Sequence, residues 1–410
     1  MLFNKNYSKP IQYTMRRITG IVATMFMTAT IAMGQSTERC ATESTQPRNC
    51  FAVSFFEATG YATEEENYCI SPASAMWALA MSANGADGKT AQEIYAALGY
   101  PDAYKNREEF NNTQLAGIMA LSDNEDAEIN VANSIWIDNK IDVKEQFKST
   151  SEKYYNAAVK SVTLSSAADE INSWCSKETN GKINKIIDHF PSTSQMAILN
   201  ALWFKGRWVF PFTKEATRKK AFRKADGETV KVDMMKQSCY ATYYEDEFMQ
   251  ATARKFEDSK YSMLFILPAE GVSTESAVER LNQIYDNDFA KGERYMFEFE
   301  VPKFKIEFGT DITPVFKELG IKRAFTGKAD FSGISQTGLS IDNVIQKNCI
   351  SIDETGVEAA GATAIMRCGA WPTPPEKKKH MKLDRPFIFA IRENVNGTIL
   401  FMGRVGNPAQ

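Results

Sequence analysis

The chain has 410 residues, of which 43% are hydrophobic and 24% charged, with a formal net charge of −3. This hydrophobic content is enough for a large core, and no linker, repeat or low-complexity run divides the sequence, so one large globular domain is expected. The small net charge, with both signs interspersed, excludes the basic surface that nucleic-acid binding would need.

The first 34 residues are predicted to be an export signal. Arg16 and Arg17 precede a largely apolar run at residues 18–33, which is too short for a membrane span. Small residues end this run, so cleavage is expected after Gly34. The mature protein is therefore expected to be secreted or periplasmic, without stable insertion into a membrane.

The start of the chain leaves one alternative open. Residues 1–14 carry no apolar run, so translation could begin at Met15. A lipid anchor would need small residues directly before a cysteine, whereas Cys40 follows Thr-Glu-Arg. We expect residues 35–49 to be an unanchored N-terminal tail.

Apolar residues at three- and four-residue spacing predict helices in the first half of the chain and at two later places. The expected helices are residues 72–83, 89–98, 108–121, 143–155, 167–179, 273–285 and 313–319. Strand-like alternation is found at residues 128–138, 196–208, 248–255, 261–268 and 293–308, and two further strands close the chain. Helices come first and strands dominate later, which favours an α+β domain with a large sheet.

The seven cysteines, an odd number, show no metal-ligand spacing and cannot all pair within the chain. A Cys40–Cys50 bridge is an alternative left open, and Cys368 is the expected free thiol. The cysteines expected to be small buried residues are Cys69, Cys175 and Cys349.

No catalytic motif is found in the sequence. There are only two histidines, His189 and His380, so a histidine-rich metal site is excluded and a Ser-His-Asp triad would have to use one of them. Nucleophile-elbow, Walker and Rossmann patterns are missing. We therefore predict that the protein is not an enzyme and has no metal and no cofactor. A hydrolase that uses two distant carboxylates is the alternative.

Small residues alternate in the tract at residues 353–365, which reads DETGVEAAGATAI. In an extended strand Val357 and the three small residues that alternate with it would share one face, small enough to enter between two strands of an existing sheet. Glu358 marks the opposite face, which we expect to be solvated. A Pro-rich stretch follows and predicts an exposed loop. Taken alone, the tract favours an Ala/Gly linker or a short helix, and the rest of the chain reverses that preference.

Eight blocks of sequence, in order between residues 50 and 408, resemble the serpins. They are NYCISPAS (67–74), NVANSIW (130–136), INSW (171–174) with TNGKI (179–183), NALWFKGRW (200–208), VPKFKI (301–306), LGI (319–321) with ADFSGI (329–334), RPFIF (385–389) and LFMGRVGNP (400–408). The resemblance implies a single α+β domain with a large central mixed sheet, two further sheets, about eight to nine helices, and an exposed reactive loop at about 354–384.

The resemblance also implies a function, the suicide inhibition of serine peptidases, with cysteine peptidases as a second class. The peptidase cleaves the loop and forms an acyl-enzyme, after which the severed hinge inserts as a new central strand and distorts the peptidase. The alternative is a non-inhibitory binding or chaperone-like protein on the same fold. The expected partner is the target peptidase, and the protein itself is expected to be a monomer.

The expected inhibitory mechanism rests on two groups of residues. The hinge consists of Glu354, Gly356, Val357, Glu358, Ala359, Ala360, Gly361, Ala362 and Thr363. Val357 stands where the family usually has Thr, and its β-branched side chain should still allow insertion. The polar cluster that controls sheet opening is assigned to Ser71, Ser74, Asn200, Trp208 and Gln346, with Gln346 in the place of the usual His.

The scissile bond follows from the family's spacing. The residue before the cut usually lies sixteen positions past the hinge glutamate, and counting from Glu354 gives Ala370, with Trp371 after it. A small residue there favours an elastase- or subtilisin-like target. Arg367-Cys368 is the alternative, for a trypsin-like target, but a cut there would shorten the inserted strand by three residues, or about 10 Å.

Overall fold

A mixed six-stranded sheet forms the centre of the fold. The computed structural model describes residues 47–122, 127–257, 260–284, 294–358 and 379–410. In order across the sheet, the strands are β10 (Phe304–Asp311), β11 (Asn343–Ile352), β12 (Gly356–Val357), β4 (Met196–Arg207), β2 (Ala127–Asp138) and β3 (Ala158–Val162). Because β4 pairs antiparallel with β2 but parallel with β11, the sheet is mixed, as expected.

A second sheet has nine strands. Its path runs through β1 (Asn67–Ile70), β15 (Ile399–Val405), β14 (Phe387–Glu393), β8 (Tyr261–Pro268), β7 (Met249–Lys255), β6 (Thr229–Glu245), β9 (Arg294–Pro302) and β13 (Lys379–Lys382), and β5 (Arg218–Arg223) pairs with β6. The long strand β6 pairs with β7 at its end and with β9 before that. The two further sheets implied by the resemblance are therefore two parts of one sheet, joined through β6.

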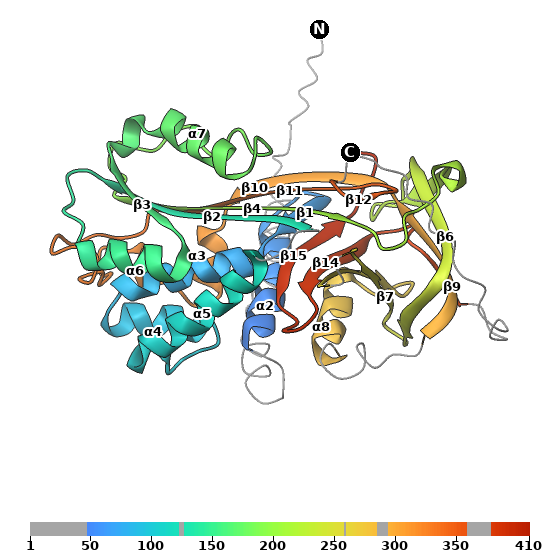
Figure 1. Cartoon of the computed structure of the whole chain (residues 1–410), viewed down its shortest axis with the longest axis horizontal. Coiled ribbons are helices and arrows are strands. Elements are labelled where there is room, and N and C mark those ends of the chain that lie inside the picture. The colour runs from blue at the N-terminus through green and yellow to red at the C-terminus, as the bar shows by residue number, and fades with distance from the viewer. Residues whose placement is uncertain (1–46, 123–126, 258–259, 285–293, 359–378) are drawn as a thin grey trace, which may run out of the picture. The chain divides into compact units, whose positions relative to one another are not determined.

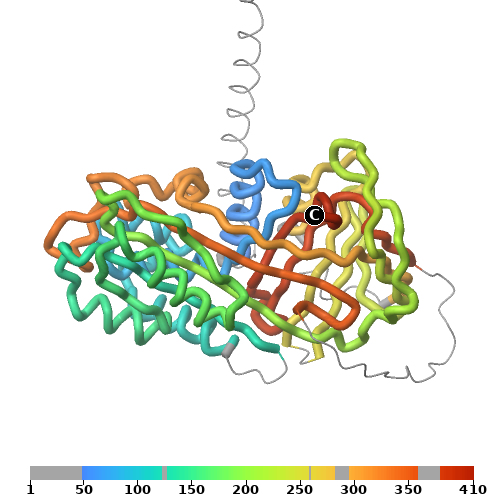
Figure 2. Tube along the Cα trace, turned by 90° about the horizontal axis from the view of Figure 1, so that it is seen from above, coloured from blue at the N-terminus to red at the C-terminus, as the bar shows by residue number. Residues whose placement is uncertain are grey.

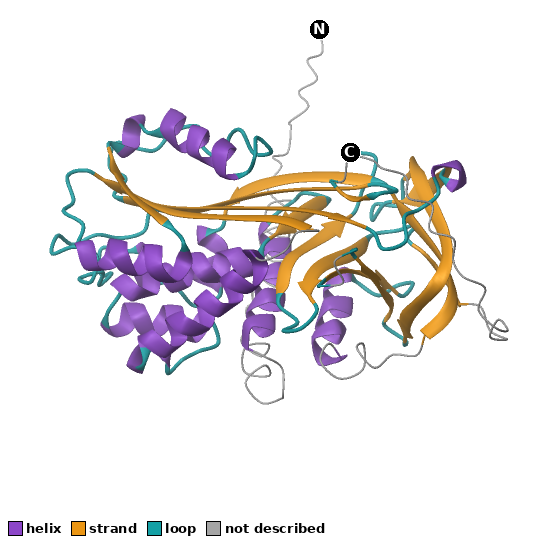
Figure 3. Ribbon diagram, viewed as in Figure 1, coloured by secondary structure: helices purple, strands orange, loops and turns teal. Residues whose placement is uncertain are grey.

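Eight α-helices are found among the described residues. They are α2 (Pro47–Ala62), α3 (Pro72–Gly85), α4 (Gly88–Ala97), α5 (Arg107–Ser122), α6 (Glu145–Tyr155), α7 (Ala168–Glu178), α8 (Thr274–Ile284) and α9 (Thr313–Glu318). Figure 1 shows α7 on one face of the central sheet and α3 on the opposite face. The helices α4, α5 and α6 gather beside α3, as the purple ribbons of Figure 3 show. None of the described helices is long and apolar enough to cross a membrane.

The side chains of the central strands alternate between the two faces of the sheet. Trp136 of β2, Leu199 of β4 and Ile345 of β11 pack with Ile171 of α7 in one buried cluster. Since alternate residues of a strand share a face, the residues between them point toward α3. This alternation decides on which side of the sheet each functional side chain lies.

Helix α3 begins at a sequence signal for a helix N-terminus. The Ser71 side chain accepts a hydrogen bond from the backbone N–H of Ser74 at 3.3 Å, and Pro72 occupies the first turn, where its missing N–H costs nothing. The helix is apolar all round and almost wholly buried, as expected for a helix enclosed by other elements. Ser71 and Ser74 are thereby fixed beneath the central sheet.

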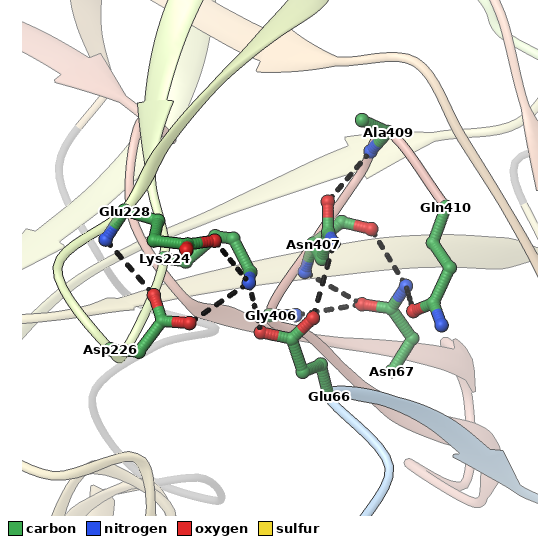
Figure 4. A network of polar contacts seen from close by, with 9 residues as sticks. All are labelled: Glu66, Asn67, Lys224, Asp226, Glu228, Gly406, Asn407, Ala409 and Gln410. Atoms are coloured by element: carbon green, nitrogen blue, oxygen red, sulfur yellow. Dashed lines mark hydrogen bonds and ion pairs between the residues drawn. The ribbon is translucent and has the colours of Figure 1, made fainter.

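A network of polar contacts holds the C-terminal tail against the start of β1 (Figure 4). The Asn67 amide oxygen accepts hydrogen bonds from the backbone N–H groups of Gly406 and Asn407, at 2.8 and 2.9 Å. Its amide nitrogen donates to the Asn407 carbonyl at 2.7 Å. Next to it, Lys224 has only 11% of its side chain exposed and pairs with three carboxylates, those of Glu66, Asp226 and Glu228. The network joins the start of β1, the β5–β6 hairpin and the C-terminal tail.

The structure differs from the sequence-based expectations at two places. Helix α2 begins at Pro47, so ordered structure starts before residue 50, and the sequence analysis did not predict this helix. The single strand expected at residues 293–308 is two strands in different sheets, β9 and β10, divided at Lys303. The apolar alternation shifts by one residue at the break, from Phe297, Phe299 and Val301 to Phe304, Ile306 and Phe308, and this shift is the sequence signal that could have shown it.

Candidate functional site

The parallel seam between β4 and β11 is where the central sheet can receive another strand. The two strands pair from Ala197 opposite Asn343 to Leu202 opposite Asn348, and this pairing goes no further. Beyond this point β4 continues to Arg207, and β11 continues to Ile352. The short strand β12 enters between these two ends.

A tight turn leads from β11 into β12. The Asp353 carboxylate accepts hydrogen bonds from the backbone N–H groups of Thr355, at 2.7 Å, and Gly356, at 3.2 Å, which fixes the turn. Val357 then lies opposite Ile352 on one side and Gly206 on the other, with its side chain fully buried. Figure 2 shows this hairpin in orange-red. The first residues of the expected hinge strand, Gly356 and Val357, thus lie paired between the ends of β4 and β11.

Gly356 is required by the close approach of β12 to β4. A Cβ atom at this position would lie 2.0 Å from the Gly206 carbonyl oxygen, far inside van der Waals contact, and φ is +159°. Any other residue would push the two strands apart. Gly356 is thus needed for the packing of β12 against β4.

Glu354 is anchored outside the sheet. Its carboxylate accepts hydrogen bonds from Lys303 Nζ at 2.9 Å and Thr217 Oγ1 at 2.8 Å. Burial acts to raise the pKa of Glu354, but these hydrogen bonds and the lysine charge outweigh it, so that the pKa is lowered. Glu354 therefore holds the start of the hinge in a fixed position.

Glu358 lies on the opposite face from Val357, as expected, but it is not solvated. Only 6% of its side chain is exposed, and its carboxylate pairs with Lys182 Nζ at 3.0 Å and accepts a hydrogen bond from the Trp203 indole. The Cys349 thiol lies 3.5 Å from the same carboxylate. Burial and the charge of Glu358 raise the pKa of this thiol to about 11, so it is protonated and donates. The sequence could not show this pocket, because Trp203 and Cys349 meet only across the seam and Lys182 comes from the segment after α7.

The backbone of Glu358 is held as firmly as its side chain. Its N–H donates to the Ser351 carbonyl of β11 at 2.9 Å, and its φ of +49° is unusual for a residue with a side chain. We call Glu358, Lys182, Trp203 and Cys349 the hinge latch. Trp203 and Cys349 directly follow Leu202 and Asn348, the last paired residues of β4 and β11. The hinge latch therefore lies just past the end of this pairing.

Gln346 is the centre of a polar cluster on the other face of the seam. Its amide nitrogen donates to the Asn200 amide oxygen at 2.7 Å and to the Ser71 carbonyl at 3.0 Å, and its oxygen accepts from the Ser71 N–H at 2.9 Å. Gln346 lies directly opposite Asn200 in the parallel register. The Gln346–Asn200 hydrogen bond therefore joins the two strands that must separate for a new strand to enter.

Two further residues complete this cluster, and the sequence analysis did not assign them to it. Asn133 of β2 accepts hydrogen bonds from Ser74 and from Asn200. Asn348 donates to the Gln346 oxygen at 3.0 Å. Both are buried asparagines inside strands where apolar residues dominate, and this is the signal that could have identified them.

Trp208 does not belong to the polar cluster. It follows the last residue of β4, eight positions after Asn200, which is about 26 Å in an extended strand. Its backbone N–H instead donates to the Thr355 carbonyl at 2.9 Å, and its indole N–H donates to the backbone carbonyl of Asp353 at 3.2 Å. Trp208 supports the turn before the hinge.

Several expected residues lie outside the described part of the chain. They are Ala359, Ala360, Gly361, Ala362 and Thr363 of the hinge, both alternatives for the scissile bond, Ala370–Trp371 and Arg367–Cys368, and the export signal with Cys40. The bridge from Cys40 to Cys50 therefore stays a prediction. Cys69, Cys175 and Cys349 are buried, as expected.

The mixed six-stranded sheet with β12 between the ends of β4 and β11, and the nine-stranded sheet beside it, define the class of the fold. The model of the family described as serpin (serine protease inhibitor) matches residues 46–408, and the chain belongs to this family. Members are protease inhibitors rather than enzymes, although some, such as thyroxine-binding globulin, are non-inhibitory.

Related proteins span almost the whole domain. A serpin-like protein of Thermococcus kodakarensis is 33% identical over 358 residues, which cover 85% of this chain and 82% of that protein. The structure of the thermophilic serpin tengpin in its native state is similar with a TM-score of 0.81 and 32% identity, over 88% of this chain and 93% of that chain. Thyroxine-binding globulin in complex with thyroxine gives a TM-score of 0.79 and 26% identity, over 89% and 99%.

Proposed function

We propose that this chain inhibits serine peptidases by suicide trapping. The observation that carries the proposal is the position of Val357, buried between the ends of β4 and β11. A chain that continues from Val357 in the same direction would run into the parallel seam between these strands. After cleavage of the loop, residues 359 onward are free to follow this path.

The energy for trapping comes from strand formation. An inserted strand of about 14 residues gains on the order of ten ladder hydrogen bonds, each contributing roughly 0.5–1.5 kcal/mol net. The total of roughly 10 kcal/mol is comparable with the whole stability of a typical domain, which is about 5–15 kcal/mol. It is therefore sufficient to disorder the catalytic site of a peptidase that is still attached to the loop.

Opening the seam must separate the six residue pairs that join β4 and β11. Among the side chains, the Gln346–Asn200 hydrogen bond must break as well. A neutral amide has no titration in the physiological range. We therefore expect the opening of this sheet to lack the pH dependence that a histidine at this position would give.

The test is a covalent complex. The purified protein is incubated with elastase-like, subtilisin-like and trypsin-like peptidases, and the products are separated in detergent after boiling. A band at the summed mass of inhibitor and peptidase supports trapping. Cleavage by every peptidase with no such band would reject it in favour of the non-inhibitory alternative, a binding protein such as the thyroxine-complexed relative.

Mass spectrometry of the released C-terminal peptide then locates the scissile bond. We expect this peptide to begin at Trp371 and the target to be an elastase- or subtilisin-like enzyme. A peptide that begins at Cys368, released from a stable complex with a trypsin-like enzyme, would contradict the assignment.

We further propose that the protein acts outside the cytoplasm. The support is the Arg-Arg start, the short apolar run and the small residues before Gln35. N-terminal sequencing of exported material is expected to begin at Gln35. A different start, or a lipid on Cys40, would overturn this proposal.

A further inference from the structure

Three potential metal ligands converge where β13 meets β9. In the parallel pairing of these strands, His380 lies directly opposite Glu298. His380 Nε2 lies 3.6 Å from Glu298 Oε1 and 3.9 Å from Glu300 Oε1. All three ligand atoms lie within 4.8 Å of one another. Two ligands of a tetrahedral zinc ion, each about 2.1 Å from it, are about 3.4 Å apart, so small side-chain movements would complete the geometry.

A positive charge is already held at this place. Lys236 Nζ lies 2.6 Å from Glu298 Oε1 and 3.8 Å from Glu300 Oε1, the same two oxygens that His380 approaches. The other oxygen of Glu300, Oε2, pairs separately with Lys220 at 2.7 Å. The ammonium of Lys236 thus acts as a tethered cation in front of two carboxylate oxygens and an imidazole nitrogen.

The burial of these groups differs in a way that favours exchange of the cation. Glu300 has 5% of its side chain exposed and is fixed in place, whereas Lys236 has 39% exposed and can turn into solvent. We propose that Glu298, Glu300 and His380 bind a divalent metal ion of the zinc class, in competition with Lys236. The mixed nitrogen and oxygen donor set suits zinc or cobalt, whereas calcium and magnesium prefer oxygen alone.

The ion would link two strands that the chain order keeps apart. β13 is only four residues long and directly follows residues 359–378, while β9 lies in the interior of the nine-stranded sheet. An ion held by side chains of both strands adds a cross-link at the C-terminal end of this segment. Because the ion binds the folded protein, zinc is also expected to raise the midpoint of thermal unfolding.

The first test measures zinc and cobalt binding to the full mature chain by calorimetry and by the visible spectrum of the cobalt form. Loss of even an outer-shell partner costs roughly 10–100-fold in metal affinity, so His380→Ala and Glu298→Gln should each weaken binding by at least about tenfold. His189→Ala is the matched control, because His189 is the other histidine and is exposed. It should leave binding unchanged.

The second test uses the competing lysine. Lys236→Gln removes the tethered cation without removing a ligand, so it should tighten zinc binding several-fold. Circular dichroism checks that each variant is folded. No binding to the wild type and to Lys236→Gln at millimolar zinc, or equal binding to wild type and His380→Ala, would overturn the proposal.

Discussion

Val357 is a fully buried residue close to the end of the described segment 294–358. It lies between Ile352 and Gly206 with no exposed side-chain area, and its face is the inner one, toward α3. A charge at this position would have to be buried without a partner, which costs several kcal/mol. The identity of this one side chain should therefore decide whether insertion can start.

Val357→Arg is expected to convert the inhibitor into a substrate. The loop should still be cleaved, but the stoichiometry of inhibition should rise many-fold because the hinge stalls at its first inserted residue. Titration of a target peptidase with the variant measures this stoichiometry. Ala359→Asp should act in the same way.

The matched control is Val357→Thr, which keeps the β-branched shape and should retain inhibition. If Val357→Arg and Ala359→Asp both inhibit with the wild-type stoichiometry, insertion of this segment is not the trapping step.

At the scale of elements, the hinge latch connects β12 to the segment after α7. An ion pair with a lysine that is 42% exposed, as Lys182 is, is screened by solvent and contributes only about 0.2–1 kcal/mol. Without the lysine, the Glu358 carboxylate stays buried and loses its ion-pair partner, which costs more, about 1–3 kcal/mol. Removal of the lysine should therefore weaken the partial insertion of the hinge.

Lys182→Met is expected to speed hydrogen exchange in the peptide that covers residues 353–358, by roughly fivefold for a loss of about 1 kcal/mol. Lys185→Met is the control, because Lys185 lies on the same segment but pairs with Asp188. Equal exchange rates in the two variants would show that the latch does not hold the hinge.

The seam between β4 and β11 could be predicted only in part from the sequence. Small alternating residues predicted a strand that enters a sheet, and the resemblance supplied Ser71, Asn200 and Gln346. The end of the pairing at Leu202 and Asn348, and the entry of β12 there, depend on strands far apart in the sequence. Strand register is set by such non-local contacts.

On the scale of the whole molecule, the uncleaved chain is expected to be the less stable form. Cleavage within residues 359–378 should raise the midpoint of thermal unfolding by on the order of 10–20 °C, since a gain of roughly 10 kcal/mol is spread over a large domain. Calorimetry at one scan rate, before and after limited proteolysis, makes the comparison.

Val357→Arg provides the internal control for this prediction. It should be cleaved at the same bond and gain little stability, because its strand cannot enter. A wild-type protein whose unfolding midpoint is unchanged by cleavage would argue against strand insertion in this chain.

The sequence by itself determined which residues could form the hinge and the buried core. The small alternating side chains of the hinge, the glycine at 356, the buried cysteines and most helices could be predicted, because they follow from local periodicity, side-chain size and turn chemistry. The family resemblance extended this to the single α+β domain and its central sheet.

The tertiary structure decided where the first residues of the hinge lie and what holds them. The sequence predicts a solvent-facing Glu358, yet this residue is buried by Lys182, Trp203 and Cys349, which come from three separate segments. Trp208 belongs to the turn before the hinge instead of the polar cluster, and Asn133 joins that cluster. Such partners meet only when strands that are far apart in the sequence pair with each other. The free energy of that pairing depends on non-local contacts, so no local sequence pattern predicts it.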